Sequence, residues 1–171
     1  MSKKRSFLIV NSSALLVQEV AGAYRPAQAE EVLQAAQALL LGRVRGREVM
    51  SSPGVVRDFL RVRLGALEHE VFAVVHLDAQ NRVLEYVEMF RGTVTQTSVY
   101  PREIVKEALA RNSAAVLLVH NHPSGVAQPS RADEALTTTL KAALALVDVR
   151  VLDHLIVAGP EILSFAERGL L

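Results

Sequence analysis

The stretch HNHPSGVAQPSRAD, residues 120–133, decides the fold class of this chain, because it joins a predicted strand to a predicted helix. The run before it, 115–119, is apolar and typical of a short buried strand. After it, apolar residues recur at helical spacing over 131–147. Two prolines and a glycine inside the stretch indicate a sharply turning loop. The chain therefore passes from a strand through a loop to a helix, as in α/β domains.

The same stretch carries three side chains that can bind a metal ion. His120 and His122 are two residues apart at the end of the predicted strand, so their side chains project from one face. Asp133 falls in the first turn of the following helix, where its carboxylate can return to the same point. Two imidazoles and one carboxylate leave the fourth tetrahedral position open for water, as in catalytic zinc sites. The chain has no cysteine, which excludes thiolate ligands and disulfides.

A purely structural interpretation exists for each of these residues. Ser130 and Asp133 have the spacing of a capping box, with Asp in place of the preferred Glu or Gln. A single histidine in a loop is usually only solvated. The set favours a metal site, because imidazoles without partners beside a core strand cost stability.

The elements around this stretch predict a mixed sheet packed with helices. Strands are expected over 71–77, over 82–90 and, last, over 149–157. A helix is expected from Pro101 to near Asn112. The order of strands and helices indicates an α/β domain over 66–171.

Residues 1–65 form a predicted appendage that is mainly helical. Helices are expected over 29–41, ended by Gly42, and over 53–64, with Ser52 as N-cap, Pro53 first and Gly65 as the stop. Residues 1–65 contain ten Lys/Arg and five Asp/Glu, whereas 66–171 contain nine and thirteen. This charge difference supports an appendage joined to a main domain.

Bulk composition restricts the class of protein. With 171 residues and 50% hydrophobic side chains, the chain can build one globular domain with a proper core. The basic start before 7–10 is too briefly apolar for a signal peptide, and no apolar run reaches the ~20 residues of a membrane helix. We expect a cytoplasmic protein without a membrane partner. The formal net charge of +1 favours no polyanionic partner.

Several motifs together resemble a known family. The spacing from His120 to Ser130 and Asp133 is similar to the JAMM motif of MPN-domain metalloproteases, whose fold is similar to that of the zinc deaminases. The wider text looks like the bacterial RadC family over about residues 66–171. The motifs that carry this likeness are FRGT (90–93), VYPRE (99–103), HNHPSG (120–125), RVLDH (150–154) and the terminal SFAERGLL.

This resemblance implies roles for individual residues. It implies one zinc per chain, bound by His120, His122 and Asp133, with Ser130 stabilising the reacting carbonyl oxygen. It also implies a glutamate general base ahead of the first core strand of the domain, where Glu70 stands. Glu68 and Glu88 are weaker candidates, and a solvated charge at the end of a strand is the alternative for all three. The implied activity is hydrolysis of a peptide or isopeptide bond in a protein or peptide substrate.

Other interpretations of these residues are weaker. A zinc deaminase is excluded because its motif needs cysteines. We expect His154 to be a satisfied core histidine, and no spacing recruits His69 or His76. The main alternative is a DNA-associated accessory or binding protein, since the RadC family carries a DNA-repair label.

Residues 1–65 support that alternative only through their arginines. They lack the paired hairpin signature of the helix-hairpin-helix segment found in many RadC proteins. An arginine cluster remains, for which a solvated face is the favoured interpretation and weak phosphate binding the minor one. Its members are Arg43, Arg45, Arg47, Arg57, Arg61 and Arg63.

Overall fold

The computed structural model divides the chain into two compact units, 1–39 and 40–171. It describes residues 7–10, 14–20, 22–46, 49, 53–92 and 99–171. The expected boundary at 65/66 therefore differs from the boundary of the compact units. The reason is that the predicted helix over 53–64 buries Phe59 and Leu60 in the core of the larger unit.

The first unit contains three short strands that the sequence did not predict. β1 (Phe7–Val10), β2 (Ala14–Gln18) and β3 (Tyr24–Pro26) form an antiparallel sheet in the order β1-β2-β3. Helix α1 (Ala29–Val44) begins after β3 and contains the boundary between the units. It does not end at Gly42 as expected, because Val44 is buried in the core of the larger unit.

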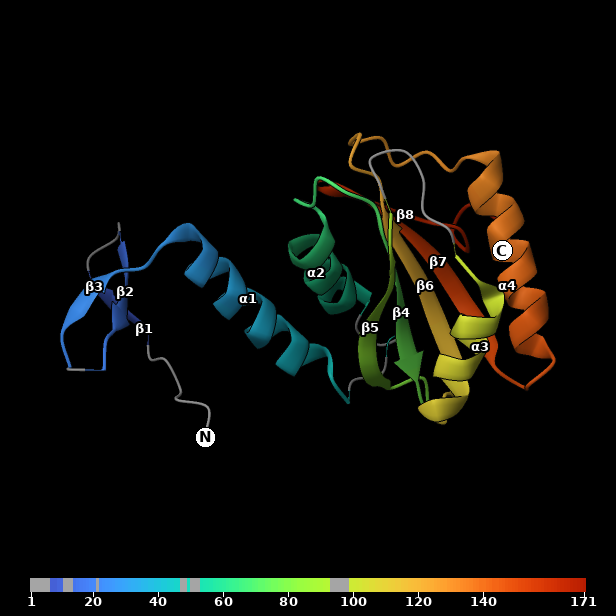
Figure 1. Ribbon diagram of the computed structural model, residues 1–171, viewed down its shortest axis with the longest axis horizontal. Helices are drawn as coiled ribbons and strands as arrows, with labels where there is room; N and C mark the ends of the chain where they lie inside the picture. The colour runs from blue at the N-terminus through green and yellow to red at the C-terminus, as the bar shows by residue number, and fades with distance from the viewer. Residues whose placement is uncertain (1–6, 11–13, 21, 47–48, 50–52, 93–98) are drawn as a thin grey trace. The chain divides into compact units, whose positions relative to one another are not determined.

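The larger unit is built on a five-stranded mixed sheet, which confirms the predicted α/β class (Figure 1). The strand order is β5-β4-β6-β7-β8, and only β6 and β7 pair in parallel. The strands are β4 (Val71–Leu77), β5 (Val83–Arg91), β6 (Ala115–Asn121), β7 (Arg150–Ala158) and β8 (Glu161–Ser164). The sequence predicted all of these strands except β8, which has four residues and forms a hairpin with β7.

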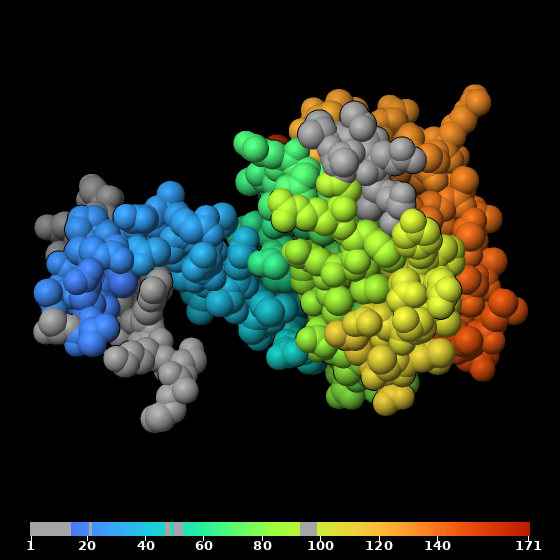
Figure 2. All heavy atoms as spheres, in the orientation of Figure 1, coloured from blue at the N-terminus to red at the C-terminus, as the bar shows by residue number. Residues whose placement is uncertain are grey.

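Helices cover both faces of this sheet. Helix α2 (Pro53–Leu64) packs on one face, and α3 (Pro101–Ala110) and α4 (Arg131–Ala145) pack on the other. In Figure 2 the yellow atoms of α3 and the orange atoms of α4 form adjoining parts of one surface, in agreement with their mutual contacts. Pro53 and Pro101 open their helices as predicted, whereas Ser52 lies outside the described residues.

Alternation along β4 separates the two cores. Val71, Ala73 and Val75 belong to the cluster on the α2 side, and Phe72 and Val74 belong to the cluster beneath α3 and α4. Buried strands with both faces covered are expected to be continuously apolar, as β4 and β6 are. The side of the sheet on which a residue lies can therefore be read from this alternation.

Gly65 ends α2 as predicted, and the structure gives a second reason for glycine. A Cβ atom at this position would lie 2.6 Å from the carbonyl oxygen of Arg61 and 2.7 Å from that of Gly159. Both distances are too short for any side chain. Gly65 thus allows the end of α2 to approach the end of β7 closely.

No helix in the described part of the chain is long and apolar enough to cross a membrane.

Candidate metal centre

Strand β6 delivers two histidines to one edge of the sheet. It extends through Asn121, two residues beyond the predicted end, so His120 is a strand residue and His122 follows directly. His120 is buried, and its ring stacks on Phe72 of β4 with ring centroids 6.2 Å apart. The backbone amide of His122 donates to the carbonyl of Val157 on β7 at 2.9 Å. Both neighbouring strands thus fix the two histidines.

Asp133 reaches the same point from the start of α4. The loop turns at Gly125, whose φ of 76° favours glycine, and Ser130 then caps the helix. The Ser130 hydroxyl donates to Asp133 Oδ2 at 2.7 Å, and the Ser130 amide donates to the same oxygen at 2.7 Å. The capping box predicted as an alternative to the metal site is therefore present, and it includes Asp133.

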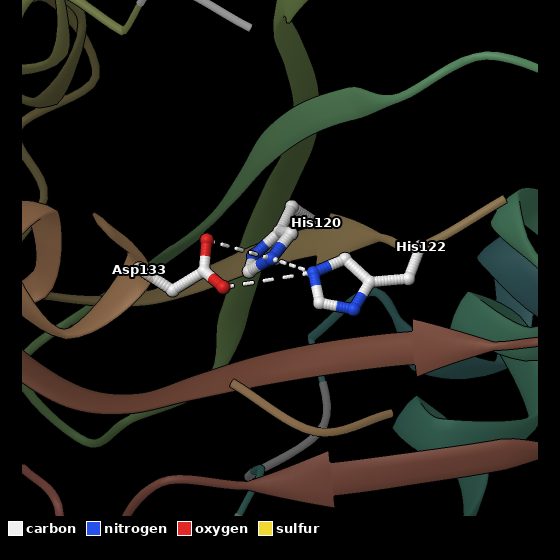
Figure 3. Close-up of side chains that lie close together, drawn as sticks. All are labelled: His120, His122 and Asp133. Carbon is white, nitrogen blue, oxygen red and sulfur yellow. Dashed lines mark hydrogen bonds and ion pairs between the residues drawn. The ribbon is translucent and has the colours of Figure 1, made fainter. Parts of the chain in front are cut away.

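Three ligand atoms converge between these elements (Figure 3). His120 Nε2 and His122 Nε2 are 2.9 Å apart. Asp133 Oδ1 lies 3.4 Å from His120 Nε2, and Asp133 Oδ2 lies 3.6 Å from His122 Nε2. This group of two histidines and one aspartate could hold a metal ion.

The electrostatics of the group agree with this capacity. Burial alone would raise the pKa of Asp133, but hydrogen bonds with His120, His122 and Ser130 hold it well below its usual range. The hydrogen bond with Asp133 raises the pKa of His122 against the effect of burial, and the charge of Glu70 adds to the rise. The site thus concentrates negative charge beside two imidazoles.

The ring of His122 is oriented by the loop that it precedes. Its Nδ1 lies 2.7 Å from the carbonyl oxygen of Val126. A carbonyl can only accept, so Nδ1 carries the proton in this contact. Nε2 is then the nitrogen available to a metal ion, which is how a hydrogen bond on one ring nitrogen usually directs the other.

Glu70 stands immediately before β4 and is half-buried. The pairing of β4 with β6 ends at Phe72 and His120, two residues after Glu70 and two residues before His122. The effect of its charge on the pKa of His122 agrees with this placement.

Asn121, between the two histidines, holds the backbone on both sides of Glu70. Its Oδ1 accepts from the Val71 amide at 2.7 Å, and its Nδ2 donates to the His69 carbonyl at 3.0 Å. The side chain is buried. Asn121 was not predicted as a functional residue, because the central asparagine in His-Asn-His gives no signal until β4 and β6 are paired.

The other two glutamates lie elsewhere. Glu68 is exposed in the turn before β4. Glu88 pairs with Ala73, which places it on the α2 side of the sheet, where it binds Arg63 at 2.8 Å and Tyr86 at 3.2 Å. The structure therefore separates Glu88 from the histidines by the sheet itself.

The arginine cluster is largely occupied by acidic partners. Among its described members, four form ion pairs: Arg45 with Glu85, Arg57 with Glu167, Arg61 with Asp58 and Arg63 with Glu88. Arg47 lies outside the described residues. These contacts agree with the interpretation of a solvated, ion-paired face.

Comparison with known proteins adds the family. A family model described as "RadC-like JAB domain" matches residues 50–170. The chain is 58% identical over 150 residues to a UPF0758 protein of Leptothrix cholodnii, an alignment that covers 88% of this chain and 68% of that protein. It is 60% identical over 151 residues to a UPF0758 protein of Aromatoleum aromaticum, which covers 88% and 67%. A UPF0758 protein of Dechloromonas aromatica is 66% identical over 126 residues, with 73% and 56% covered.

Proposed function

The chain belongs to the family of proteins with a RadC-like JAB domain, and on that premise we propose that it is a zinc-dependent hydrolase that cleaves a peptide or isopeptide bond. The observation that carries the proposal is the convergence of His120, His122 and Asp133 from β6 and α4. Histidine and carboxylate are ligands that zinc accepts, and three protein ligands leave one position open.

The spacing of the ligand atoms supports zinc. Atoms bound tetrahedrally at 2.0–2.1 Å from zinc lie about 3.3 Å from one another. The two Nε2 atoms are 2.9 Å apart, and they lie 3.4 Å from Asp133 Oδ1 and 3.6 Å from Asp133 Oδ2 respectively, so a turn of the carboxylate that brings one oxygen toward both nitrogens would complete the set. Small shifts of the side chains would bring the three atoms to bonding distance.

Held by His120, His122 and Asp133, zinc would supply a water with its pKa lowered to ~7 and would polarise the carbonyl of the substrate. Glu70 is the general base: its carboxylate takes one proton from the attacking water and returns it to the leaving amine. The new C–O bond forms first, and the C–N bond breaks as the amine leaves with the returned proton. To stabilise the developing charge on the carbonyl oxygen, the Ser130 hydroxyl would turn its proton toward that oxygen from Asp133 Oδ2, which it bonds at 2.7 Å.

Two observations favour Glu70 over the other glutamates as the base. Glu70 lies two residues before the Phe72–His120 pair that ends the β4–β6 ladder, and its charge raises the pKa of His122. Asn121 holds the backbone before and after it, which restricts where its carboxylate can reach. Glu88 has neither property and pairs with Arg63.

The test separates metal binding from chemistry. Protein purified without chelator is expected to contain close to one zinc per chain by elemental analysis. Glu70→Gln should keep that zinc and lose about 10²–10⁴-fold in hydrolysis rate, measured on a panel of peptide and isopeptide substrates. Glu68→Gln is the matched control, because it removes a neighbouring exposed carboxylate and should leave the rate unchanged.

Two results would contradict the proposal. A wild type that carries no zinc and does not take up added zinc would overturn the metal site. Full activity in Glu70→Gln together with loss of activity in Glu88→Gln would overturn the assignment of the base.

A DNA-associated role is less well supported. Ion pairs to carboxylates reduce the positive charge that Arg45, Arg57, Arg61 and Arg63 offer to phosphates. Fluorescence anisotropy with oligonucleotides across a salt series is the check. Tight binding that persists at physiological salt and falls in an Arg57→Ala and Arg61→Ala double variant would favour this second role.

A further inference from the structure

We propose that His154 and Thr137 are positioning residues that fix the ring of His120, so that its Nε2 faces the metal centre with a free lone pair. The inference rests on the zinc site proposed above. His154 lies on β7, and Thr137 lies on α4 one turn after Asp133, so both are outside the stretch 120–133 that carries the ligands. Both are buried.

A continuous line of hydrogen bonds runs behind His120. His120 Nδ1 lies 2.8 Å from His154 Nε2, and His154 Nδ1 lies 2.6 Å from Thr137 Oγ1. The Thr137 hydroxyl then lies 2.6 Å from the backbone carbonyl oxygen of Asp133. The line therefore starts at one proposed ligand and ends on the residue that supplies another.

The Asp133 carbonyl at the end of this line determines which atom carries each proton in it. The Asp133 carbonyl can only accept, so it receives the single proton of the Thr137 hydroxyl. Thr137 Oγ1 must then accept from His154, which places the proton of that ring on Nδ1. In a neutral His154 the other nitrogen, Nε2, accepts from His120 Nδ1.

A neutral ring at His154 follows from its surroundings. The ring is fully buried and packs against Phe72 and Phe165, with centroid distances of 5.7 and 4.7 Å. The adjacent carboxylate, that of Asp153, bonds the Ser164 hydroxyl and the Ala166 amide instead of the ring. A charged imidazolium in such a place would carry a large desolvation cost.

The consequence for His120 is a single proton arrangement. Its Nδ1 donates to His154, so when the His120 ring is neutral, as metal binding requires, its Nε2 carries the lone pair and faces His122 and Asp133. Partners of this kind behind a metal-binding histidine fix both its tautomer and its ring orientation. Here the same partners also tie the strand that carries His120 to the helix that carries Asp133.

The first experiment measures zinc affinity by competition with a chelator. His154→Gln and Thr137→Val are expected to weaken zinc binding about 10–100-fold. Thr137→Ser keeps the hydroxyl and should restore the wild-type affinity.

Two matched controls come from the same chain. Thr139→Val removes another α4 hydroxyl that bonds the carbonyl four residues earlier, but that hydroxyl is exposed. His76→Gln removes another fully buried histidine that also bonds a hydroxyl. Neither control should change the affinity for zinc. Equal losses in Thr137→Val and Thr139→Val, or no loss in His154→Gln and Thr137→Val, would overturn the proposal.

The second experiment reads the protons directly by long-range ¹H–¹⁵N correlation of the imidazole rings. In the full chain at pH 8, His154 should carry its proton on Nδ1 with and without zinc, and zinc-bound His120 should carry its proton on Nδ1. A proton on His154 Nε2 would overturn the inference. Because the metal-free spectrum tests the proton arrangement by itself, failure of this inference can be distinguished from failure of the zinc site.

Discussion

Two buried histidines of the same sheet differ in what their second ring nitrogen meets. His76 of β4 pairs with Val116 near the start of β6, and the ring of His154 contacts His120 near its end. Each bonds one hydroxyl, that of Ser113 at 2.8 Å and that of Thr137 at 2.6 Å. His154 has a second partner in His120, whereas His76 Nε2 has no hydrogen-bond partner among the described residues.

The difference shows what burial of an imidazole achieves in each place. Both rings are withdrawn from water, and burial lowers the pKa of both. At the end of β6 the cost is offset by bonds that hold a proposed metal ligand. At the start of β6 the ring of His76 holds no proposed ligand, and the cost of burying it appears as a dependence of stability on pH.

The largest expected effect concerns His122, a proposed metal ligand directly after β6. His122→Ala removes one of three converging ligand atoms, so the variant should lose its zinc completely by elemental analysis while its circular dichroism spectrum stays that of the wild type. His76→Gln, on β4 beside the start of β6, should keep close to one zinc per chain. Retention of stoichiometric zinc by His122→Ala would contradict the assignment of this ligand.

The second effect concerns the residue between the two histidines. Asn121→Ala removes both bonds that hold the backbone beside Glu70, so the carboxylate should lose its position. We expect a rate loss of about 10²-fold, typical of a misplacement near 1 Å, with zinc content unchanged. Faster hydrogen exchange of the Val71 amide would mark the lost bond. An unchanged rate in a variant that shows this faster exchange would argue against a positioning role.

The third effect concerns His76 and the dependence of stability on pH. Burial, helped by the charge of Arg111, lowers the pKa of His76 from 6.5 to about 4. The folded ring therefore stays neutral while the unfolded ring binds a proton, so His76 costs stability as pH falls from 6.5 towards 4. The loss should reach about 3 kcal/mol near pH 4.

Denaturant unfolding of metal-free protein between pH 7 and 4 measures this loss. The pH dependence should be shallower in His76→Gln than in the wild type by up to that amount. Parallel curves for the two proteins would show that His76 is protonated in the fold.

The smallest effect separates loss of stability from loss of zinc. Gly65→Ala forces a Cβ against two backbone oxygens and should lower the free energy of unfolding by about 1–3 kcal/mol. Gly54→Ala, where no atom lies within 4 Å, is the matched control and should be neutral or stabilising by under about 1 kcal/mol. Neither should alter zinc affinity measured below the unfolding transition. A weaker affinity in Gly65→Ala would mean that global stability alone explains the His154 and Thr137 effects.

The sequence was sufficient wherever the signal is local. The His/Asp group that could hold a metal ion lies within residues 120–133, so one continuous strand–loop–helix segment carries all its members. Strand β4 has the predicted bounds, because a continuous apolar run between polar turns has few other interpretations.

The sequence alone did not predict contacts that depend on strand pairing. The contact between His154 and His120 exists only in the observed parallel register of β6 and β7, and the bonds of Asn121 need β4 beside β6. The three strands of the first unit were missed because they are short and interrupted by polar residues. Except for Asp58, which precedes Arg61 by three residues, the acidic partners of the arginine cluster lie far along the chain, up to 110 residues away, so no local pattern could reveal them.

The capping box at the start of α4 has a consequence for how fast the site can fill. Asp133 is held by Ser130 through two bonds to Oδ2, so its carboxylate stays in place before any ion arrives. An ion that enters the proposed site would meet a carboxylate already in position and would not have to wait for a loop to fold. Uptake should then be governed by the exchange of water on the ion, and the Ser130 amide, which shares the carboxylate with the ion, becomes a natural reporter of occupancy.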